Sequence, residues 1–251
     1  QCHDGRCTDT LIYILVKAKH LIPEKDEYSV EKSDRSDLIQ SALAMGFMSC
    51  IVNIGTVILQ RAINGLGTDI VTAHTAARKI FDILMFMLYI VGNAVTTYVS
   101  QNMGAGRYDR VHQGVRAAII INTIITTVMI IFGWLLSPAL IKLVAGTSAS
   151  AIIDPAVRYV RIGVTCFYVL GPLFVLRCAM QGMGRKIVPV MSSTIELVGK
   201  VLAVMILTPR LGYLGVTITE PIIWFCCTLM LSIMYLTTPV EKLVEKRRAA
   251  N

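Results

Sequence analysis

The sequence predicts an all-α, polytopic membrane protein whose six transmembrane helices form a bundle. Of its 251 residues, 55% are hydrophobic and 16% are charged, whereas globular proteins carry about 25% charged residues. The mean hydropathy is +0.64. Uncharged runs of about 20 residues recur along the chain, and an α-helix needs about that length to cross a bilayer. These observations favour helices in a bilayer over a water-soluble core.

A turn of small residues is the reference point for the layout. Residues 104–106 (Gly-Ala-Gly) separate two uncharged stretches, 83–100 and 117–136. Three basic residues follow the turn: Arg107, Arg110 and Arg116. Glycine permits a sharp turn, and arginines beside apolar segments of this length tend to stay on the cytoplasmic side. We therefore expect a cytoplasmic hairpin between two transmembrane helices.

The chain before the first long apolar run is expected to be the end of a truncated helix and a linker. Residues 11–16 form an apolar stub, which is too short to span about 30 Å of hydrocarbon. Residues 23–37 are rich in charge and serine and have no apolar period, as in a solvated linker. We therefore expect the sequence to be a fragment in which residues 1–37 precede the membrane bundle.

Six spans follow, separated mostly by short turns. They are expected at 38–60, 71–100, 117–143, 158–180, 187–207 and 213–237. Glycine-containing turns are expected at 64–67, 181–186 and 209–212, and a longer loop at 145–155. Residues 38–237 would form the six-helix lobe, and residues 238–251 a basic cytoplasmic tail.

The distribution of basic residues supports this topology. Fourteen Lys and Arg residues fall on the proposed cytoplasmic side, and four fall on the other: Lys142, Arg158, Arg161 and Arg210. This asymmetry follows the positive-inside rule and places both ends of the chain in the cytoplasm. We expect a multi-pass protein of the plasma membrane. Because topology explains the net charge of +8, we do not expect nucleic-acid binding.

Polar residues recur on one face of several spans. In the first span, Asn53, Thr56 and Gln60 follow one another at steps of three and four residues, as do Tyr89 and Asn93 in the second. Polar side chains in a bilayer must meet other helices or water. They could hold helices together, at about 0.6 kcal/mol each, or they could line a hydrated central cleft. The sequence is compatible with either role: these residues could join helices, or they could bind substrate or a cation.

Ionisable residues within the spans are stronger candidates. Glu196 is the tenth residue of the fifth span, and Lys200 lies one turn further on the same face. Glu220 in the sixth span precedes Pro221, which leaves a backbone carbonyl without its helical donor. These carboxylates could bind a proton, a small cation or a cationic substrate, or the Glu196–Lys200 pair could be purely structural. We expect Arg177 to extend its side chain toward the cytoplasmic surface.

Three motifs resemble the MATE (multidrug and toxic compound extrusion) transporter family. They are SQNMGAGRYDRV at 100–111, MQGMGRKIVP at 180–189 and INGLGTDIVTAHTAARKI at 63–80. The resemblance implies a twelve-helix carrier with two six-helix lobes, which exports organic cations in exchange for Na⁺ or H⁺ by alternating access. The chain is similar to the C-terminal lobe. Some members carry an acidic residue in the first helix of this lobe, where this chain has only Asn53 and Gln60.

We therefore expect a secondary antiporter for drugs and other organic cations, present as its C-terminal half. Its partners would be the lipid bilayer, the N-terminal six-helix lobe and cationic amphiphilic molecules, with Na⁺ or H⁺ as coupling ion and no cofactor. Drug and ion would compete for the carboxylates and for aromatic groups such as Tyr89 and Tyr168. Whether a metal binds is left open. No catalytic residues are expected, because the spans lack a Ser/His dyad, a paired Asp motif and a His-rich set.

Two alternatives remain. A lipid-linked oligosaccharide flippase of the same superfamily would need more cationic residues in its cleft to bind pyrophosphate. The chain could also be an inactive membrane fragment, since a single lobe would expose its polar faces to lipid. We expect such an isolated lobe to self-associate.

Overall fold

The computed structural model describes residues 32–240, and this part of the chain is helical, with no strand. The chain divides into two compact units, residues 1–43 and 44–251. Of the first unit, only the beginning of helix α2 lies within the described residues. The second unit holds the rest of α2 and helices α3 to α8, and all that follows concerns this second unit unless stated.

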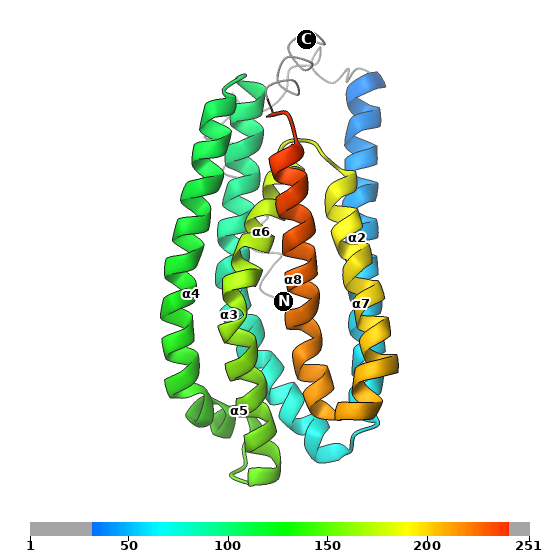
Figure 1. Ribbon diagram of the computed structural model, residues 1–251, viewed down its shortest axis with the longest axis vertical. Helices are drawn as coiled ribbons and strands as arrows, with labels where there is room; N and C mark the ends of the chain where they lie inside the picture. Colours follow the sequence, from blue (N-terminus) through cyan, green and yellow to red (C-terminus); the bar gives the residue numbers. More distant parts are fainter. Residues whose placement is uncertain (1–31, 241–251) are drawn as a thin grey trace, which may run out of the picture. The chain divides into compact units, whose positions relative to one another are not determined.

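The described helices follow the predicted order of spans (Figure 1). They are α2 (Lys32–Asn64), α3 (Thr68–Gly104), α4 (Tyr108–Ala145), α5 (Ser150–Thr165), α6 (Phe167–Gly182), α7 (Ile187–Leu211) and α8 (Tyr213–Thr237). Five of these are long and apolar enough to cross a membrane, and α5 and α6, bent by 53°, can form a sixth, broken span. The prediction of an all-α, multi-pass membrane protein with up to six spans is confirmed.

The glycine turns lie where the sequence predicts them. Helix α3 ends at Gly104 and α4 begins at Tyr108. Between them Gly106 has a φ of 69°, which a residue with a side chain rarely adopts. The backbone amide of Arg107 donates to the carbonyl of Asn102 at 2.8 Å and closes the turn. The hairpin predicted around residues 104–106 is therefore present.

The fourth predicted span differs from the structure. It was expected to be one helix over residues 158–180, but the chain is helical from Ser150 to Gly182 and breaks at Cys166. Pro172 lies in the second turn of α6 and cannot donate to the carbonyl of Tyr168, next to the break. The expected loop at 145–155 is correspondingly short, because α5 already includes Pro155.

The first predicted span also begins earlier than expected. Helix α2 starts at Lys32, so residues 32–37, expected to be linker, are helical. The stub at 11–16, residues 23–31 of the expected linker and the tail at 241–251 lie outside the described residues.

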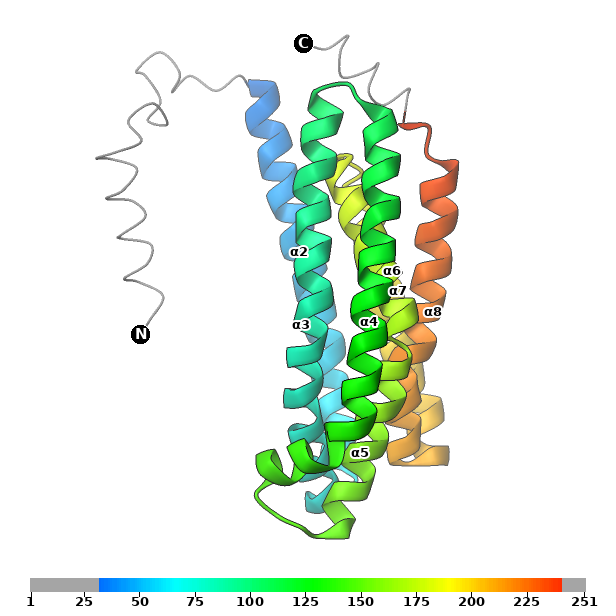
Figure 2. The same ribbon diagram turned by 90° about the vertical axis from the view of Figure 1, so that its left-hand side faces the viewer.

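Aromatic residues from four helices form the centre of the main hydrophobic core. Helix α3 packs against α4, α5 and α6, and α8 packs against α6 and α7 (Figures 1 and 2). Phe81 of α3 is fully buried, with its ring centroid 4.9 Å from that of Phe167 and 5.6 Å from that of Tyr159. It also stacks on Trp224 at 6.0 Å. Such pairs contribute about 0.5–1.5 kcal/mol each beyond the area they bury.

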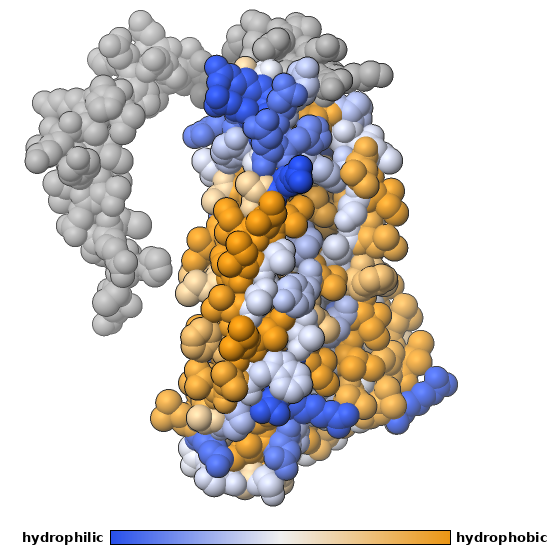
Figure 3. Space-filling view, turned by 60° about the vertical axis from the view of Figure 1, so that its left-hand side comes forward, coloured by the Kyte–Doolittle hydropathy of each residue, from blue (hydrophilic) through white to orange (hydrophobic). Residues whose placement is uncertain are grey.

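The face of the described helices seen in Figure 3 carries a broad hydrophobic belt, with hydrophilic side chains gathered above and below it. Large apolar side chains are exposed on several helices, including Leu135 at 72%, Met205 at 69% and Phe225 at 62%. An apolar surface of this extent would be unfavourable in water. It fits a protein whose helices face lipid or further membrane helices.

Candidate substrate and ion site

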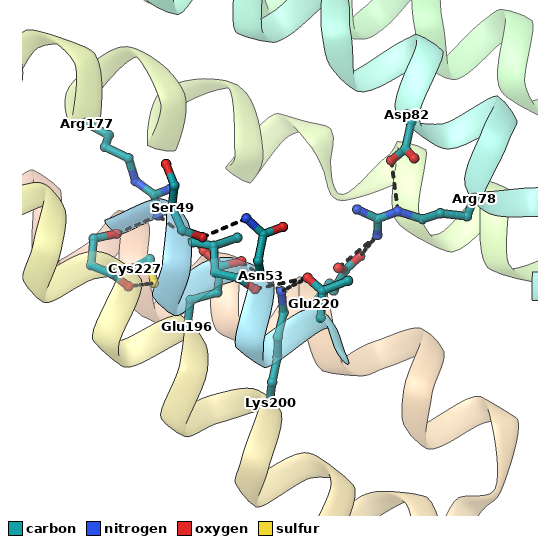
Figure 4. Close-up of polar contacts among 12 residues, drawn as sticks. Ser49, Asn53, Arg78, Asp82, Arg177, Glu196, Lys200, Glu220 and Cys227 are labelled. Atoms are coloured by element: carbon teal, nitrogen blue, oxygen red, sulfur yellow. Dashed lines mark hydrogen bonds and ion pairs between the residues drawn. The ribbon is translucent and has the colours of Figure 1, made fainter. Parts of the chain in front are cut away.

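An arginine of α3 holds the buried carboxylate of α8. Arg78 donates from Nη1 to both carboxylate oxygens of Glu220, each at 2.9 Å. Its Nε forms an ion pair with Asp82, one turn further along α3, at 2.8 Å. The hydroxyl of Tyr159 on α5 donates to Oε2 of Glu220 at 3.1 Å. Glu220 therefore links three helices, with its side chain only 10% exposed. Figure 4 shows its contact with Arg78.

Glu220 belongs to a row of four residues along one side of α8. Thr217, Glu220, Trp224 and Cys227 are all buried, between 1% and 8% exposed. The i, i+3 and i+4 spacing places them on the side of α8 that faces the other helices. A carboxylate on this face needs charged or hydrogen-bonding partners, and Arg78 and Tyr159 provide them.

A second charged group lies between α6 and α7. Lys200 Nζ and Glu196 Oε1 are 2.9 Å apart, and the two side chains are 3% and 13% exposed. Arg177 of α6 forms a longer ion pair with Glu196, at 3.5 Å, and donates to Ser192 Oγ at 2.7 Å. Lys200 also reaches α2, where Thr56 Oγ1 lies 3.5 Å from Nζ.

Close packing of α2 on α7 permits this reach. A Cβ atom at Gly55 would lie 3.0 Å from Cδ of Lys200, closer than nearly all Cβ contacts. Glycine at this position leaves room for the lysine side chain beside Thr56.

The two groups form one row of charges that alternate in sign. Lys200 interacts electrostatically with Glu220 as well as with Glu196. The row consists of Arg177, Glu196, Lys200, Glu220, Arg78 and Asp82 (Figure 4). Three positive and three negative groups give a formal sum of zero. We call these six residues the charge row. Mutual pairing offsets the large cost of removing each charge from water.

Four of the residues predicted as site candidates lie together in or beside this row: Thr56, Glu196, Lys200 and Glu220. Asn53 lies one turn before Thr56 on α2, is exposed, and donates to the Ser49 carbonyl at 2.8 Å. Gln60 bonds within α2, from Nε2 to Asn64 Oδ1 at 3.0 Å. Whether any of them binds substrate or ion stays a prediction.

The other three candidates make contacts away from the charge row. Tyr89 is 46% exposed and packs edge-on against Phe174, with centroids 5.9 Å apart. Asn93 is exposed on α3, and its carbonyl accepts from the Thr97 hydroxyl at 3.5 Å. Tyr168 forms a hydrogen bond with Thr127 of α4 at 3.0 Å.

Two arginines of the charge row have different roles from those the sequence suggests. Arg177 was expected to extend to the surface, but its side chain is only 11% exposed because Ser192 and Glu196 offer acceptors inside the bundle. Arg78 lies near the start of the second predicted span, ten residues after the first residue of α3, and its side chain reaches Glu220 of α8. The i, i+4 spacing of Arg78 and Asp82 indicates an ion pair between them, because residues four apart lie on the same face of a helix.

Among the described residues, no group of three or more His, Cys, Asp or Glu side chains is arranged to hold a metal ion. The acidic members of the charge row are instead held by arginine, lysine and tyrosine.

A lobe of membrane-spanning helices with paired charges in its interior is an architecture of secondary transporters. The MatE family model matches residues 44–206, more than half of the sequence. The chain belongs to the MATE family, whose members are transporters rather than enzymes.

Solved transporter structures share this fold. A MATE structure in the bent conformation aligns with a TM-score of 0.82 at 16% identity, over 97% of this chain and 54% of that one. An outward-facing multidrug resistance MATE transporter aligns with a TM-score of 0.70 at 14% identity, over 80% of this chain and 45% of that one. A MOP superfamily transporter from Pyrococcus furiosus aligns with a TM-score of 0.69 at 13% identity, over 80% of this chain and 44% of that one. That transporter is described as having a binding pocket of reverse polarity, which suggests a different function.

The chain thus spans about half the length of the solved transporters that it matches. A comparison with curated protein sequences gave no match.

Proposed function

We propose that this chain forms one lobe of a secondary antiporter that exports organic cations in exchange for Na⁺ or H⁺. A second six-helix lobe would complete the carrier, and cationic amphiphilic molecules would be its substrates. The α3–α4 turn and both ends of the chain would face the cytoplasm of a cell whose plasma membrane holds the carrier. Family membership and the fold support a transporter, and the charge row supports the cationic substrate.

The observation that carries the proposal is the pairing of Glu196 with cations of the protein itself. Lys200 and Arg177 are its ion-pair partners. An antiporter needs a carboxylate that binds the substrate, the coupling ion and a cationic side chain of the protein in turn. An unpaired charge at this depth would cost at least about 2.5 kcal/mol. An internal lysine avoids that cost whenever substrate and ion are both absent.

Lys200 is placed to change partners. It lies near two carboxylates, 2.9 Å from Glu196 and within electrostatic reach of Glu220. When a proton, Na⁺ or an organic cation neutralises Glu196, Lys200 retains its contact with Thr56 and its electrostatic attraction to Glu220. Glu196 is therefore our candidate for the residue at which substrate and coupling ion compete.

Transport by the complete carrier in proteoliposomes tests this proposal. Efflux of a fluorescent organic cation would be measured under an imposed Na⁺ or H⁺ gradient, for the wild type and for Glu196→Gln. Asp109→Asn is the matched control, because Asp109 is an exposed carboxylate in the first turn of α4. We expect gradient-driven efflux to fall at least tenfold in Glu196→Gln and to persist in Asp109→Asn. The 251-residue chain alone should not transport.

Other outcomes have distinct meanings. Unchanged efflux in Glu196→Gln would make the Glu196–Lys200 pair structural. If folded carrier moved no organic cation under either gradient, the antiporter proposal would fail. A flippase for lipid-linked oligosaccharides would be expected to have an excess of cations for pyrophosphate, and the three anions of the charge row balance its three cations.

A further inference from the structure

Helices α4 and α5 line an open surface pocket that shares no residue with the charge row. Its volume is about 740 Å³, and its lining includes Trp134 and Pro138 of α4 and Asp154, Arg158 and Arg161 of α5. Apolar side chains, among them Ile153 and Ile162, form the rest of the wall. A pocket of this size can hold a small ligand or part of a larger one.

The two arginines of this pocket have no carboxylate partner among the residues that the structure describes. Arg161 donates from Nη2 to the Trp134 carbonyl at 3.0 Å and lies over the Trp134 ring, 5.1 Å from its centroid. Its Nε is buried without a hydrogen-bond partner. Arg158 is exposed, and neither arginine forms an ion pair with Asp154, although Asp154 lies on the same helix. The pocket therefore carries a formal excess of one positive charge.

Helix length places the pocket toward the non-cytoplasmic end of the third predicted span, residues 117–143. Residue 117 begins the uncharged stretch of α4 directly after Arg116, and Trp134 lies 17 residues beyond it. This separation is about 26 Å along a helix, close to the thickness of ~30 Å of the hydrocarbon core. Tryptophan prefers this boundary, and Figure 3 shows hydrophilic side chains at the lower margin of the hydrophobic belt, the end at which α5 lies.

We propose that this α4–α5 pocket binds the phosphodiester of an anionic phospholipid. The guanidinium groups of Arg158 and Arg161 contact the phosphate, since their donors match its oxygens in geometry and charge. One acyl chain lies against Pro138 and Ile162. Basic pockets between transmembrane helices on the cytoplasmic side bind anionic headgroups, and the same charge attraction would act here on lipid of the outer leaflet. Asp154 limits the excess charge to one, which fits a headgroup with a single negative charge.

Fluorescence of Trp134 provides a direct test. The chain has two tryptophans; Trp134 is 48% exposed and Trp224 only 7%. A Trp224→Phe variant therefore leaves one reporter, at the pocket. The 251-residue chain is reconstituted in mixtures of phosphatidylglycerol and phosphatidylcholine, with brominated acyl chains on one lipid at a time. Because a brominated chain quenches a neighbouring indole, the two series give the relative affinity of the two lipids at Trp134.

We expect phosphatidylglycerol to be preferred severalfold, and Arg158→Gln to reduce this preference by about fivefold, the effect of one basic residue near an anionic lipid. Arg161→Gln should act similarly. Arg210→Gln is the matched control, since Arg210 is exposed on α7 and belongs to the same side of the predicted topology. It should leave the preference unchanged.

Three results would overturn the proposal. They are equal quenching by both lipids in the Trp224→Phe protein, a preference that survives Arg158→Gln, and loss of the preference when millimolar inorganic phosphate is added. The last would assign the pocket to a free anion instead of a lipid. Arg158→Gln remains informative if Arg161→Gln fails to fold. Arg158 is exposed, and among the residues that the structure describes it forms no hydrogen bond or ion pair with another side chain.

Discussion

Glu220 and Glu196 are both glutamates inside the bundle, but their partners differ in kind. Glu220 accepts two hydrogen bonds of 2.9 Å from Arg78 on α3 and one of 3.1 Å from Tyr159 on α5. Glu196 has its shortest contact, 2.9 Å, with Lys200 on its own helix. Its contact with another helix, to Arg177, is 3.5 Å long.

The surroundings of the two carboxylates reinforce the difference. Arg78 lies 5.6 Å from the ring centroid of Phe81, which is itself packed against Tyr159, Phe167 and Trp224. On the other side, Nε of Arg177 is buried without a hydrogen-bond partner. We infer that Glu220 joins helices, whereas Glu196 can change partners at lower cost.

The largest effect should follow from breaking the Arg78–Glu220 pair. Glu220→Gln or Arg78→Gln should each destabilise the protein by about 3 kcal/mol, because each removes one member of a largely buried ion pair that joins two helices, although Asp82 still pairs with Arg78 and Tyr159 still donates to Glu220. The double variant should be less destabilised than the sum of the two single variants. Unfolding of the detergent-solubilised protein by heat or denaturant measures these differences. Strict additivity of the two variants would show that the pair does not stabilise the fold.

A smaller effect is expected where α3 and α6 approach each other beside the same core. A Cβ atom at Gly182 would lie 2.8 Å from the carbonyl oxygen of Thr96, which belongs to the backbone and cannot move away easily. Gly182→Ala should therefore destabilise the protein by about 1–3 kcal/mol. Gly46→Ala is the control, because no atom lies within 4 Å of its added Cβ. Equal melting temperatures for the two variants would contradict close packing on this side.

Glu196→Gln should cost about 1–2 kcal/mol, below the effect of Glu220→Gln, because buried Lys200 loses its charged partner but keeps a hydrogen-bond acceptor. The glutamine oxygen still accepts from Lys200, and Lys200 keeps Thr56 and Glu220 nearby. The same unfolding measurement applies, with Asp109→Asn as the control for loss of an exposed carboxylate. If Glu196→Gln were as destabilising as Glu220→Gln, both carboxylates would be structural and the exchange of partners at Glu196 would be untenable.

The features that the sequence predicted are local ones. Apolar runs bounded by glycine turns define most helices, and the i, i+4 spacing of Glu196 and Lys200 correctly indicated their ion pair. These signals lie within one helix or one turn. The place of Glu220 within the sixth predicted span also indicated that its charge would need partners, and Glu220 is buried beside Arg78.

Features that depend on contacts between distant segments could not be predicted in this way. Arg78 and Glu220 are 142 residues apart, and no spacing rule joins them. Arg177 looked like a surface residue because its acceptors belong to α7. Tyr168 looked available for a cleft, but the bend between α5 and α6 accompanies a contact with Thr127 of α4.

The smallest effect tests whether α2 positions Lys200. Thr56 donates to the Val52 carbonyl at 3.1 Å and accepts from Lys200 at 3.5 Å. Thr56→Val removes both bonds at a cost of about 0.6 kcal/mol. Thr72→Val is the matched control, because Thr72 is likewise exposed on a helix and bonds only the carbonyl one turn before it, at 2.9 Å. Both variants should remain folded with nearly unchanged melting temperatures.

Transport separates the two possible roles of Thr56. If Thr56 stabilises Lys200 when Glu196 is neutralised, Thr56→Val should slow gradient-driven efflux by the complete carrier two- to threefold, the rate equivalent of about 0.6 kcal/mol, while Thr72→Val leaves it unchanged. Equal rates in both variants would reduce Thr56 to a residue that bonds its own helix. A slowing as great as that of Glu196→Gln would contradict the comparison, because the exchange of partners would then depend on Thr56 of α2 as much as on the carboxylate of α7.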